Sequence, residues 1–450
     1  MLTQNLGELV ASTKAYGIDS SARDAAKRGV IDSIATMMAG RVEHAVALLS
    51  RAYKPFTKGD AIEIFECDLV GTDAAALINA TAAHVLDFDD VSLKGHPSAV
   101  MVPALLALAQ ERNAKGSELL DAYVVGYQVW GELAQRESDM HHMKGWHPTG
   151  IFGSVGAAAA CARLLRLDAG AAAHAIGLGA TQSAGLMANF GSMAKSFQAG
   201  RAAQAGIMAA KLAQQGFTAG ADVLNHSQGF LQAFSPFGRV TRSAEIAEVG
   251  KEWTIQSQPM SIKKYPTCYY THRTIDSILA LVKDVDVSEE MINCVKVHIS
   301  SEHATVLCNH QPRTGLEAKF SIEFAAACAL LHSRVSLADL TDTVVLNPRM
   351  QALMSRVETV HATEYSEQWQ GAAKADWVEI LLADGRTLET EPVVYAAGHA
   401  SRPLAREDLN EKFTSCARAG SMEIDSVEIL DRLWNLEQEN IDSLWSGLCG

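Results

Sequence analysis

The densest group of residues able to do acid–base chemistry lies between positions 84 and 98. The sequence HVLDFDD (84–90) is followed by HPS (96–98), which places three carboxylates and two imidazoles beside an apolar, Ala-rich stretch. Like charges next to an apolar helix cost free energy, and acids and bases with perturbed pKa values collect at working sites. The cluster therefore predicts a catalytic or binding site, with Asp87 and His96 as its first candidates.

Two helices are expected to position this cluster. A helix over positions 73–86 would place His84 and Asp87 on one face, because residues three apart are neighbours on a helix. Pro97 suits the first turn of a second helix, so we expect His96 at its start. Unpaired amides and the helix dipole favour an anion at that point.

Two other interpretations of the cluster remain open. In one, Asp89 and Asp90 form a solvated loop and Asp87 is only a helix cap. In the other, Asp87, Asp89, Asp90 and His96 bind a metal. The metal interpretation is the weaker one, because no second acidic motif completes the converging oxygens that a divalent ion requires.

A second cluster, HHMKGWHPTG (141–150), repeats the His-Pro pair before a Gly-rich helix start. Two imidazoles at two helix starts could face one cavity, which makes His147 a candidate; the alternative is a loop histidine without function. His141 and His142 are expected to be exposed.

Lys195 and Arg201 form a third group, in an apolar stretch bounded by glycines. Buried cations need anionic partners. We expect Arg201 to pair with a structural carboxylate. Lys195 is the better candidate for a ligand, because it is expected in the loop before an Ala-rich helix.

The segment SIKKYPTCYYTHR (261–273) contains Lys263, Cys268 and His272. It lies where helical sequence patterns give way to mixed helix and strand patterns. Binding sites favour domain interfaces. The alternative is a linker whose lysines reach water. The sequence has no G-x-S-x-G, Gly-rich dinucleotide loop, P-loop or H-E-x-x-H, which disfavours the common hydrolase, redox, kinase and zinc-protease chemistries.

Patterning along the chain predicts a mainly α fold with a mixed α/β insert. Capping residues and apolar periodicity indicate helices that start at Ser21 and Ser117. The insert is expected to hold a strand at 295–299, a helix from Asn347-Pro348 to about Val357, and a hairpin around Asp384-Gly385. Helical patterns return in 406–416 and 422–436. We place the helical domain at 1–262 plus 396–450 and the insert at 263–395.

Composition limits the function further. The chain has 450 residues, of which 48% are hydrophobic and 20% charged, enough for a large core in two or three domains. No run of about 18 apolar residues and no secretion signal is present, so we predict a cytoplasmic protein without a membrane span. The net charge of −14 disfavours nucleic acid and anionic membranes as partners.

The eight cysteines are scattered, without a C-x-x-C pair. This pattern argues against a zinc ribbon, an iron–sulfur framework or a disulfide-stapled module. Most of the cysteines are expected to be small core residues.

Taken together, these stretches resemble the MmgE/PrpD family along nearly the whole chain. The residues that carry the resemblance are HVLDFDD with HPS (84–98), WHPTGIFG (146–153), GSMAK (191–195) with GRAA (200–203), KKYPTCYYTH (263–272) and EAKFSIEF (317–324). The family includes 2-methylcitrate dehydratase, cis-aconitate decarboxylase and iminodisuccinate epimerase. The resemblance implies small polycarboxylate substrates, no metal or organic cofactor, a helical domain with an inserted α/β lid, and a homodimer.

The resemblance also assigns residues. Positions that line the active site in cis-aconitate decarboxylase-like members are matched by Asp87, His96, His147, Lys195 and Lys263. Those decarboxylases have a His where this chain has Cys268, and His272 resembles the His of many bacterial relatives. They also have a Tyr where this chain has Phe324.

These departures favour a 2-methylcitrate dehydratase-like hydro-lyase over a decarboxylase. The predicted catalytic residues are Asp87, His96, His147, Cys268 and His272, and the predicted substrate-binding residues are Lys195 and Lys263. Asp87 and His147 are expected to act as acid and base, in an order left open, while the lysines hold carboxylates. An epimerase, a decarboxylase and a silent carboxylate-binding relative are the alternatives.

Overall fold

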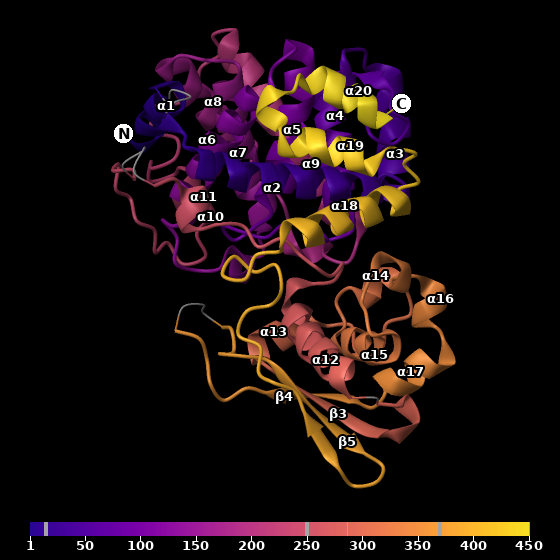
Figure 1. Cartoon of the computed structure of the whole chain (residues 1–450). Helices are drawn as coiled ribbons and strands as arrows, with labels where there is room; N and C mark the ends of the chain where they lie inside the picture. The colour runs from indigo at the N-terminus through magenta and orange to yellow at the C-terminus, as the bar shows by residue number, and fades with distance from the viewer. Residues whose placement is uncertain (13–16, 248–251, 286, 368–370, 450) are drawn as a thin grey trace. The chain divides into compact units, whose positions relative to one another are not determined.

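Helices make up most of the chain in the computed structural model (Figure 1), which describes residues 1–12, 17–247, 252–285, 287–367 and 371–449. The chain divides into two units, Met1–Ile262 with Ala405–Gly450 and Lys263–Leu404. The sheets are small, so the mainly α prediction is confirmed. Among the described residues, no helix combines the length and the apolar character needed to cross a membrane.

The first unit is a helical bundle with one short hairpin, β1 (Ala61–Ile62) and β2 (Leu69–Val70). Its helices are α1 (Leu2–Ser12), α2 (Ser20–Gly40), α3 (His44–Tyr53), α4 (Thr72–Val85), α5 (Pro97–Arg112), α6 (Gly116–Ala134), α7 (Pro148–Leu164), α8 (Ala169–Thr181), α9 (Met193–Gln214), α10 (Phe230–Phe234), α11 (Thr254–Ser257), α18 (Arg406–Ala419), α19 (Ser426–Trp434) and α20 (Ile441–Cys449).

Helices α4, α5, α7 and α9 pack against one another at the centre of this bundle. Their contact faces consist largely of Ala and Gly, which lets the helix backbones approach closely. At Gly206 of α9, for example, a Cβ atom would lie only 2.8 Å from the carbonyl carbon of Ala157 in α7. The close packing holds the ends of these four helices in fixed positions.

Three predicted helix boundaries, two starts and one end, are wrong by a few residues. Asp19 caps α2, because its carboxylate accepts from a backbone amide inside the first turn, whereas Ser21 lies within the helix. Helix α6 begins one residue before Ser117. In the second unit, α17 (Pro348–Met354) ends before Val357, which starts a strand.

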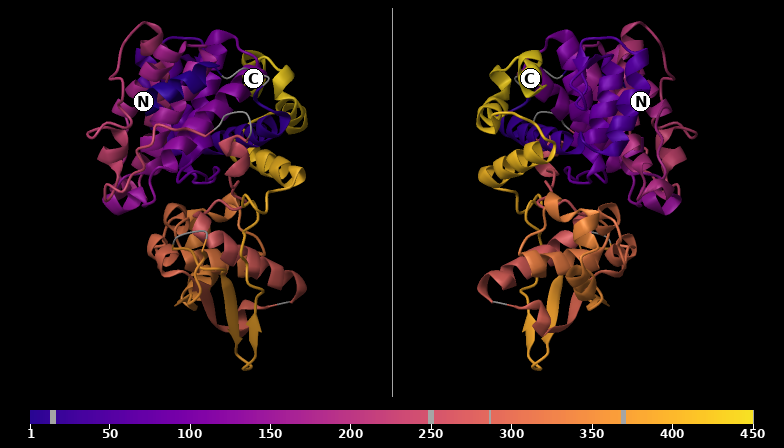
Figure 2. Two further views of the ribbon diagram at one scale, coloured as in Figure 1. Left: turned by 90° about the vertical axis from the view of Figure 1, so that its left-hand side faces the viewer. Right: turned by 90° about the vertical axis from the view of Figure 1, so that its right-hand side faces the viewer.

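The C-terminal segment returns to the first unit, where α18, α19 and α20 lie alongside the N-terminal helices in all views (Figures 1 and 2). Lys412 of α18 forms a buried ion pair of 2.5 Å with Asp32 of α2. Its ammonium also donates to the carbonyl of Phe88 at 2.7 Å and lies 3.9 Å from the centre of the Phe88 ring. The segment is therefore tied to the acidic loop that follows α4.

A disulfide between Cys67 and Cys449 joins the β1–β2 hairpin to α20. These two cysteines are exceptions to the expectation that most of the cysteines are small core residues. The two cysteines are 382 residues apart, so only the fold brings them together. Of the other cysteines, Cys161, Cys268, Cys328 and Cys416 are buried, as expected, while Cys308 is exposed.

The second unit is built on a four-stranded sheet in the order β4-β3-β5-β6. Its strands are β3 (Ile292–Ile299), β4 (Val357–His361), β5 (Trp377–Leu382) and β6 (Thr387–Glu389). Strands β3 and β4 are parallel and the other pairs are antiparallel. The predicted strand at 295–299 and the predicted hairpin are confirmed, and Gly385 takes the positive φ of 88° that the hairpin turn requires.

Helices α12 (His272–Asp284) and α15 (Ile322–His332) pack against this sheet and against each other. The remaining helices lie in the connection between β3 and β4 and are α13 (Ser301–Val306), α14 (Gly315–Ala318), α16 (Asp342–Val345) and α17. Together with the sheet they enclose the apolar core of the second unit.

The variant Gly206→Ala tests the contact between α7 and α9. The added methyl group overpacks a backbone contact that cannot yield easily, so we expect about 1–3 kcal/mol of destabilisation in urea unfolding. Gly170→Ala is the control, because this exposed helical position meets only the Asp168 carboxylate at 3.5 Å. Equal effects of the two variants would contradict the importance of the close contact.

Candidate active site

Four helix ends meet at one place in the first unit. His84 lies in the last turn of α4, while His96 and His147 are the N-cap residues of α5 and α7. The positions predicted from the two His-Pro pairs are therefore confirmed. Lys195 lies in the first turn of α9, which Ser192 caps, so its predicted place in the preceding loop is wrong. The N-terminal dipoles of three helices add positive potential here.

Asp89 connects two of these imidazoles. Nδ1 of His84 lies 3.0 Å from one carboxylate oxygen of Asp89, and Nδ1 of His96 lies 2.8 Å from the same oxygen. Burial alone would raise the pKa of Asp89, but the two imidazoles lower it well below its ordinary value. The ionised carboxylate therefore faces Nδ1 of both rings, and it accepts the Nδ1–H of His84, which leaves Nε2 of that ring as the acceptor.

The solvated-loop interpretation of Asp89 and Asp90 is wrong, because both side chains are fully buried. The sequence alone favours Asp87 over these two carboxylates as a site residue. Local propensity favours a loop after the helix, but it does not show that Lys412 and Asp32 enclose this loop. Asp89 thus positions two candidate catalytic residues.

His84 is a neutral imidazole in this setting. Burial lowers its pKa to about 4, since the protonated ring would lose its hydration. Among the described residues, its buried Nε2 atom has no hydrogen-bond partner. A buried acceptor without a partner costs free energy, so this atom is suited to a substrate group or a water molecule.

His147 is oriented by Gln198. Nδ1 of His147 lies 2.7 Å from Oε1 of Gln198, and the amide nitrogen of Gln198 donates to the carbonyl of Leu186 at 3.1 Å. A carbonyl can only accept, so the amide must present its oxygen to His147, and His147 must carry its proton on Nδ1. Burial, together with the nearby His84 and Lys195, lowers the pKa of His147 well below its ordinary value. Its Nε2 atom is therefore a free base at neutral pH.

Asp87 and Lys195 form the charged part of the site. The Lys195 ammonium lies 2.5 Å from Oδ1 of Asp87 and 5.3 Å from the centre of the Phe190 ring. Asp87 is not on the helix face with His84 as predicted: α4 ends at Val85, and Asp87 takes a left-handed conformation with φ of 52°. This turn of the backbone directs the chain into the loop that carries Asp89.

The same group contains the donors that a metal would need. One ligand atom from each of His84, Asp87, Asp89 and His96 lies within 4.8 Å of the others. In the structure these donors already contact other groups of the protein, since Lys195 binds Asp87 and the two imidazoles face Asp89. A divalent ion would have to displace these partners, so the metal interpretation remains the weaker alternative.

Comparison with known protein families finds a match for both the N-terminal and the C-terminal part of the chain. Residues 4–242 match the MmgE/PrpD N-terminal domain, and residues 265–436 match the MmgE/PrpD C-terminal domain. The chain belongs to the MmgE/PrpD family. The resemblance inferred from the sequence is thereby confirmed.

Curated relatives in the family are similar to this chain at low identity. Cis-aconitate decarboxylase from Homo sapiens is 25% identical over 445 residues, which covers 96% of this chain and 91% of that protein. Cis-aconitate decarboxylase from Aspergillus terreus (strain NIH 2624 / FGSC A1156) is 26% identical over 394 residues, or 82% of this chain and 79% of that protein. The mitochondrial 2-methylcitrate dehydratase from Yarrowia lipolytica is 34% identical over 99 residues, or 20% of this chain and 18% of that protein.

Three residues that the family resemblance assigns to the site belong to the second unit. Lys263 begins this unit. The backbone N–H of Cys268 donates to the carbonyl of Lys319, and the ring of His272 packs edge-on against Tyr265 at 5.1 Å. Their catalytic and binding roles stay predictions. Phe324, the other departure from the decarboxylases, is fully buried in α15.

Two further expectations about basic residues of this MmgE/PrpD chain are wrong. His141 is buried against the edge of Phe152, and His142 is half-buried, because the 3-10 turn His141–Lys144 folds onto the first unit. Arg201 is exposed and contacts the Gln204 side chain one turn further along α9. It therefore needs no structural carboxylate.

Residue-by-residue reasoning from the sequence missed Gln198 and undervalued His84 and Asp89. Gln198 lies one turn after Lys195 on α9, so helical spacing alone could have placed it near the same site. His84 and Asp89 belong to the motif first noted in the sequence. Their pairing depends on the turn at Asp87, which no local pattern indicates.

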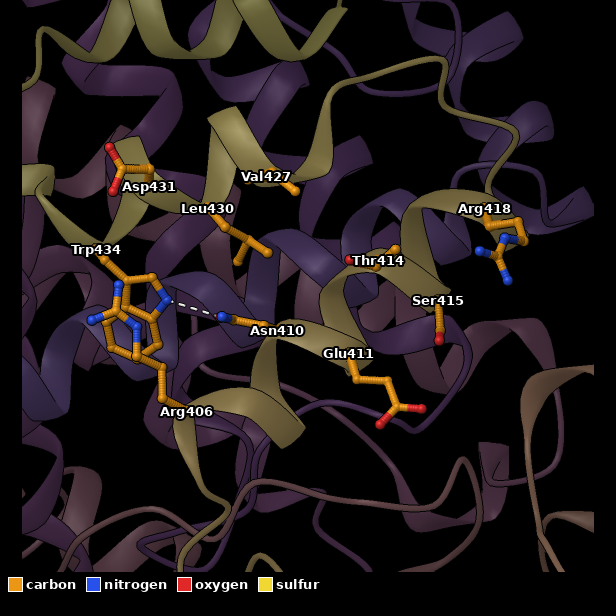
Figure 3. A pocket seen from close by; sticks show the side chains of 10 residues that line it. All are labelled: Arg406, Asn410, Glu411, Thr414, Ser415, Arg418, Val427, Leu430, Asp431 and Trp434. Carbon is orange, nitrogen blue, oxygen red and sulfur yellow. Dashed lines mark hydrogen bonds between the residues drawn. The ribbon is translucent and has the colours of Figure 1, made fainter.

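A separate hollow of about 500 Å³ lies between α18 and α19 (Figure 3). The guanidinium of Arg406 stacks over the Trp434 ring, and Trp434 donates its indole N–H to Asn410 at 2.9 Å. The ten residues that line it include no histidine, cysteine or lysine. We therefore place the candidate active site at the four helix ends.

Gln198→Leu tests the orientation of His147. Side-chain nitrogen NMR of the unmodified protein at pH 7 should show His147 neutral and protonated on Nδ1. The variant removes the acceptor, so we expect a mixture of the two neutral tautomers. Gln182→Leu, which removes another half-buried amide of the first unit, serves as control and should leave the His147 signals unchanged. A single Nδ1–H tautomer in Gln198→Leu would contradict the assigned role.

Acid should destabilise the first unit through its buried histidines. Burial lowers the pKa of His84 and of His141 to about 4, against about 6.5 when unfolded. The unfolded chain then binds more protons, so stability is complete above pH 6.5 and is lost as the pH falls toward 4. His141→Gln should lessen the slope of unfolding free energy by up to ~1.4 kcal/mol per pH unit in this window. The exposed His44→Gln should not change that slope.

Proposed function

We propose that this member of the MmgE/PrpD family is a cofactor-independent lyase that acts on a small di- or tricarboxylate. The main support is the neutral imidazole of His147, whose Nε2 atom is a base next to the Lys195 cation. Its proposed reaction is that of a 2-methylcitrate dehydratase-like hydro-lyase.

The positive groups of the site explain the choice of a carboxylate substrate. Lys195 and the N-termini of α5, α7 and α9 together attract negative charge in a buried place. Removing a proton from the carbon next to a carboxylate moves negative charge onto that carboxylate. Fixed cations and dipoles at this position lower the energy of the transition state.

The chemical step follows from the states of the imidazoles. Nε2 of His147 accepts the proton from the carbon next to the carboxylate. The carbon–oxygen bond to the hydroxyl on the adjacent carbon breaks, and the proton carried by Nε2 of His147 passes to the departing hydroxyl, which leaves as water. His147 is then neutral again, so the protein undergoes no net change. Asp87 holds the Lys195 ammonium in place, and Asp89 holds His96.

A cis-aconitate-type decarboxylase is the second candidate. Relatives of that name match 82% or more of this chain, whereas those named 2-methylcitrate dehydratase match about a fifth of it. Cys268 and Phe324 are the departures that place the dehydratase first. An epimerase of an iminodisuccinate-like dicarboxylate would share the proton removal and return the proton to the opposite face. A cytoplasmic homodimer stays a prediction.

Lys195→Met tests the proposal directly. We expect the unmodified protein to release water from citrate or 2-methylcitrate, and the variant to lose at least ~10²-fold in kcat/KM, because it lacks the cation that stabilises the developing charge. Lys211→Met on the same helix is the control, since Lys211 pairs with Glu111 away from the histidines and should not affect turnover. Full activity of Lys195→Met would contradict the mechanism.

Product analysis in deuterated water separates the alternatives. Carbon dioxide release from cis-aconitate would identify a decarboxylase, and deuterium uptake with inversion but without an unsaturated product would identify an epimerase. If neither turnover nor exchange occurs with any hydroxy-polycarboxylate, the remaining interpretation is a silent relative that only binds a carboxylate. Loss of activity on treatment with a chelator would favour the metal interpretation.

A further inference from the structure

A second group of reactive side chains lies in the second unit, at the C-terminal end of α15. Cys328 and His332 are four residues apart on this helix and thus share one face. Ser333 takes a left-handed conformation with φ of 49°, and the chain then turns back so that Asp339 reaches the same face. One ligand atom of each of Cys328, His332 and Asp339 lies within 4.8 Å of the others.

The distances do not describe a catalytic triad. Nδ1 of His332 lies 3.9 Å from Sγ of Cys328 and 2.8 Å from Oδ1 of Asp339. In a triad the nucleophile and the carboxylate contact opposite nitrogens of the ring, whereas here both face Nδ1. The thiol is also fully buried, and burial raises its pKa, so the sulfur is a poor nucleophile. Three donor atoms of these types within 4.8 Å of one another instead suit a chelate, for which the Cys328 thiol would give up its bond to the Arg334 carbonyl at 3.4 Å.

The donors match the preferences of zinc. Thiolate, imidazole and carboxylate bind Zn²⁺ at about 2.3, 2.0 and 2.1 Å, and tetrahedral angles then separate the ligand atoms by about 3.3–3.6 Å. The observed separations of 3.9 and 2.8 Å lie on either side of these values. Each of these two separations therefore differs from its tetrahedral value by about 0.5 Å.

Asp339 is already prepared as a ligand. Its Oδ2 atom accepts from the backbone N–H of Ser336 at 2.9 Å and from the Ser336 hydroxyl at 2.6 Å, which leaves Oδ1 directed at His332. Burial would raise the pKa of Asp339, but these hydrogen bonds and the nearby Arg334 lower it. The His332 side chain is 33% exposed, so the imidazole of this group can be reached from solvent.

We propose that Cys328, His332 and Asp339 form a binding site for a divalent transition metal of the zinc type, with water as the fourth ligand. Binding releases the thiol proton of Cys328 to solvent, and His332 keeps its proton on Nε2 while Nδ1 binds the ion. The soft sulfur ligand favours Zn²⁺ or Co²⁺ over Mg²⁺ and Ca²⁺. The site is independent of the proposed lyase reaction.

Cobalt provides the test, because a bond between Co²⁺ and a thiolate gives a charge-transfer absorption in the near ultraviolet. We expect the full chain, freed of metal by a chelator, to develop this band with one equivalent of Co²⁺ and to lose it when Zn²⁺ is added. The histidine and carboxylate cluster of the first unit has no thiol and cannot produce the band.

Variants connect the band to these residues. Cys328→Ser should abolish it, and His332→Gln, which removes one of the three ligands at a partly exposed position, should weaken Co²⁺ binding by at least ~10-fold. Cys308→Ser is the matched control, because this exposed thiol lies outside the group and its loss should leave the band intact. Absence of the band in the unmodified protein, or its persistence in Cys328→Ser, would overturn the proposal.

Discussion

The buried carboxylate of Asp89 is the constraint on which the candidate active site depends. A fully buried charge costs several kcal/mol unless partners compensate for it, and here the imidazoles of His84 and His96 do so. This requirement places the proton of His84 on Nδ1. It also holds the end of α4 and the start of α5 in one arrangement, because moving either helix would take one of the two imidazoles away from the carboxylate.

Two further ion pairs hold the loop that carries Asp89. Lys195 binds Asp87 at one end, and Lys412, paired with Asp32, binds the Phe88 carbonyl from the C-terminal segment. Asp90 differs from Asp89: burial, with the neighbouring Asp32 and Asp89, raises its pKa well above the ordinary value and favours its neutral form. This shift reduces the repulsion among the crowded acids.

The site combines neutral bases with fixed positive charge. Burial keeps His84 and His147 unprotonated at neutral pH, while Lys195 and three helix N-termini supply positive potential beside them. A base that is free at the working pH, next to a place where negative charge is stabilised, suits proton removal beside a carboxylate. This combination supports the chemistry that we propose for this member of the family.

The sequence by itself determined the mainly α class, the family, the hairpin at Asp384-Gly385 and the helix starts at His96 and His147. These features depend on local rules: helical periodicity, the fixed φ of proline and the turn preference of Asp-Gly. Only the tertiary structure decided that Asp89 orients two imidazoles, that Gln198 sets the proton of His147, and that Cys67 pairs with Cys449. Such choices depend on burial and on contacts between distant segments, which local patterns do not contain.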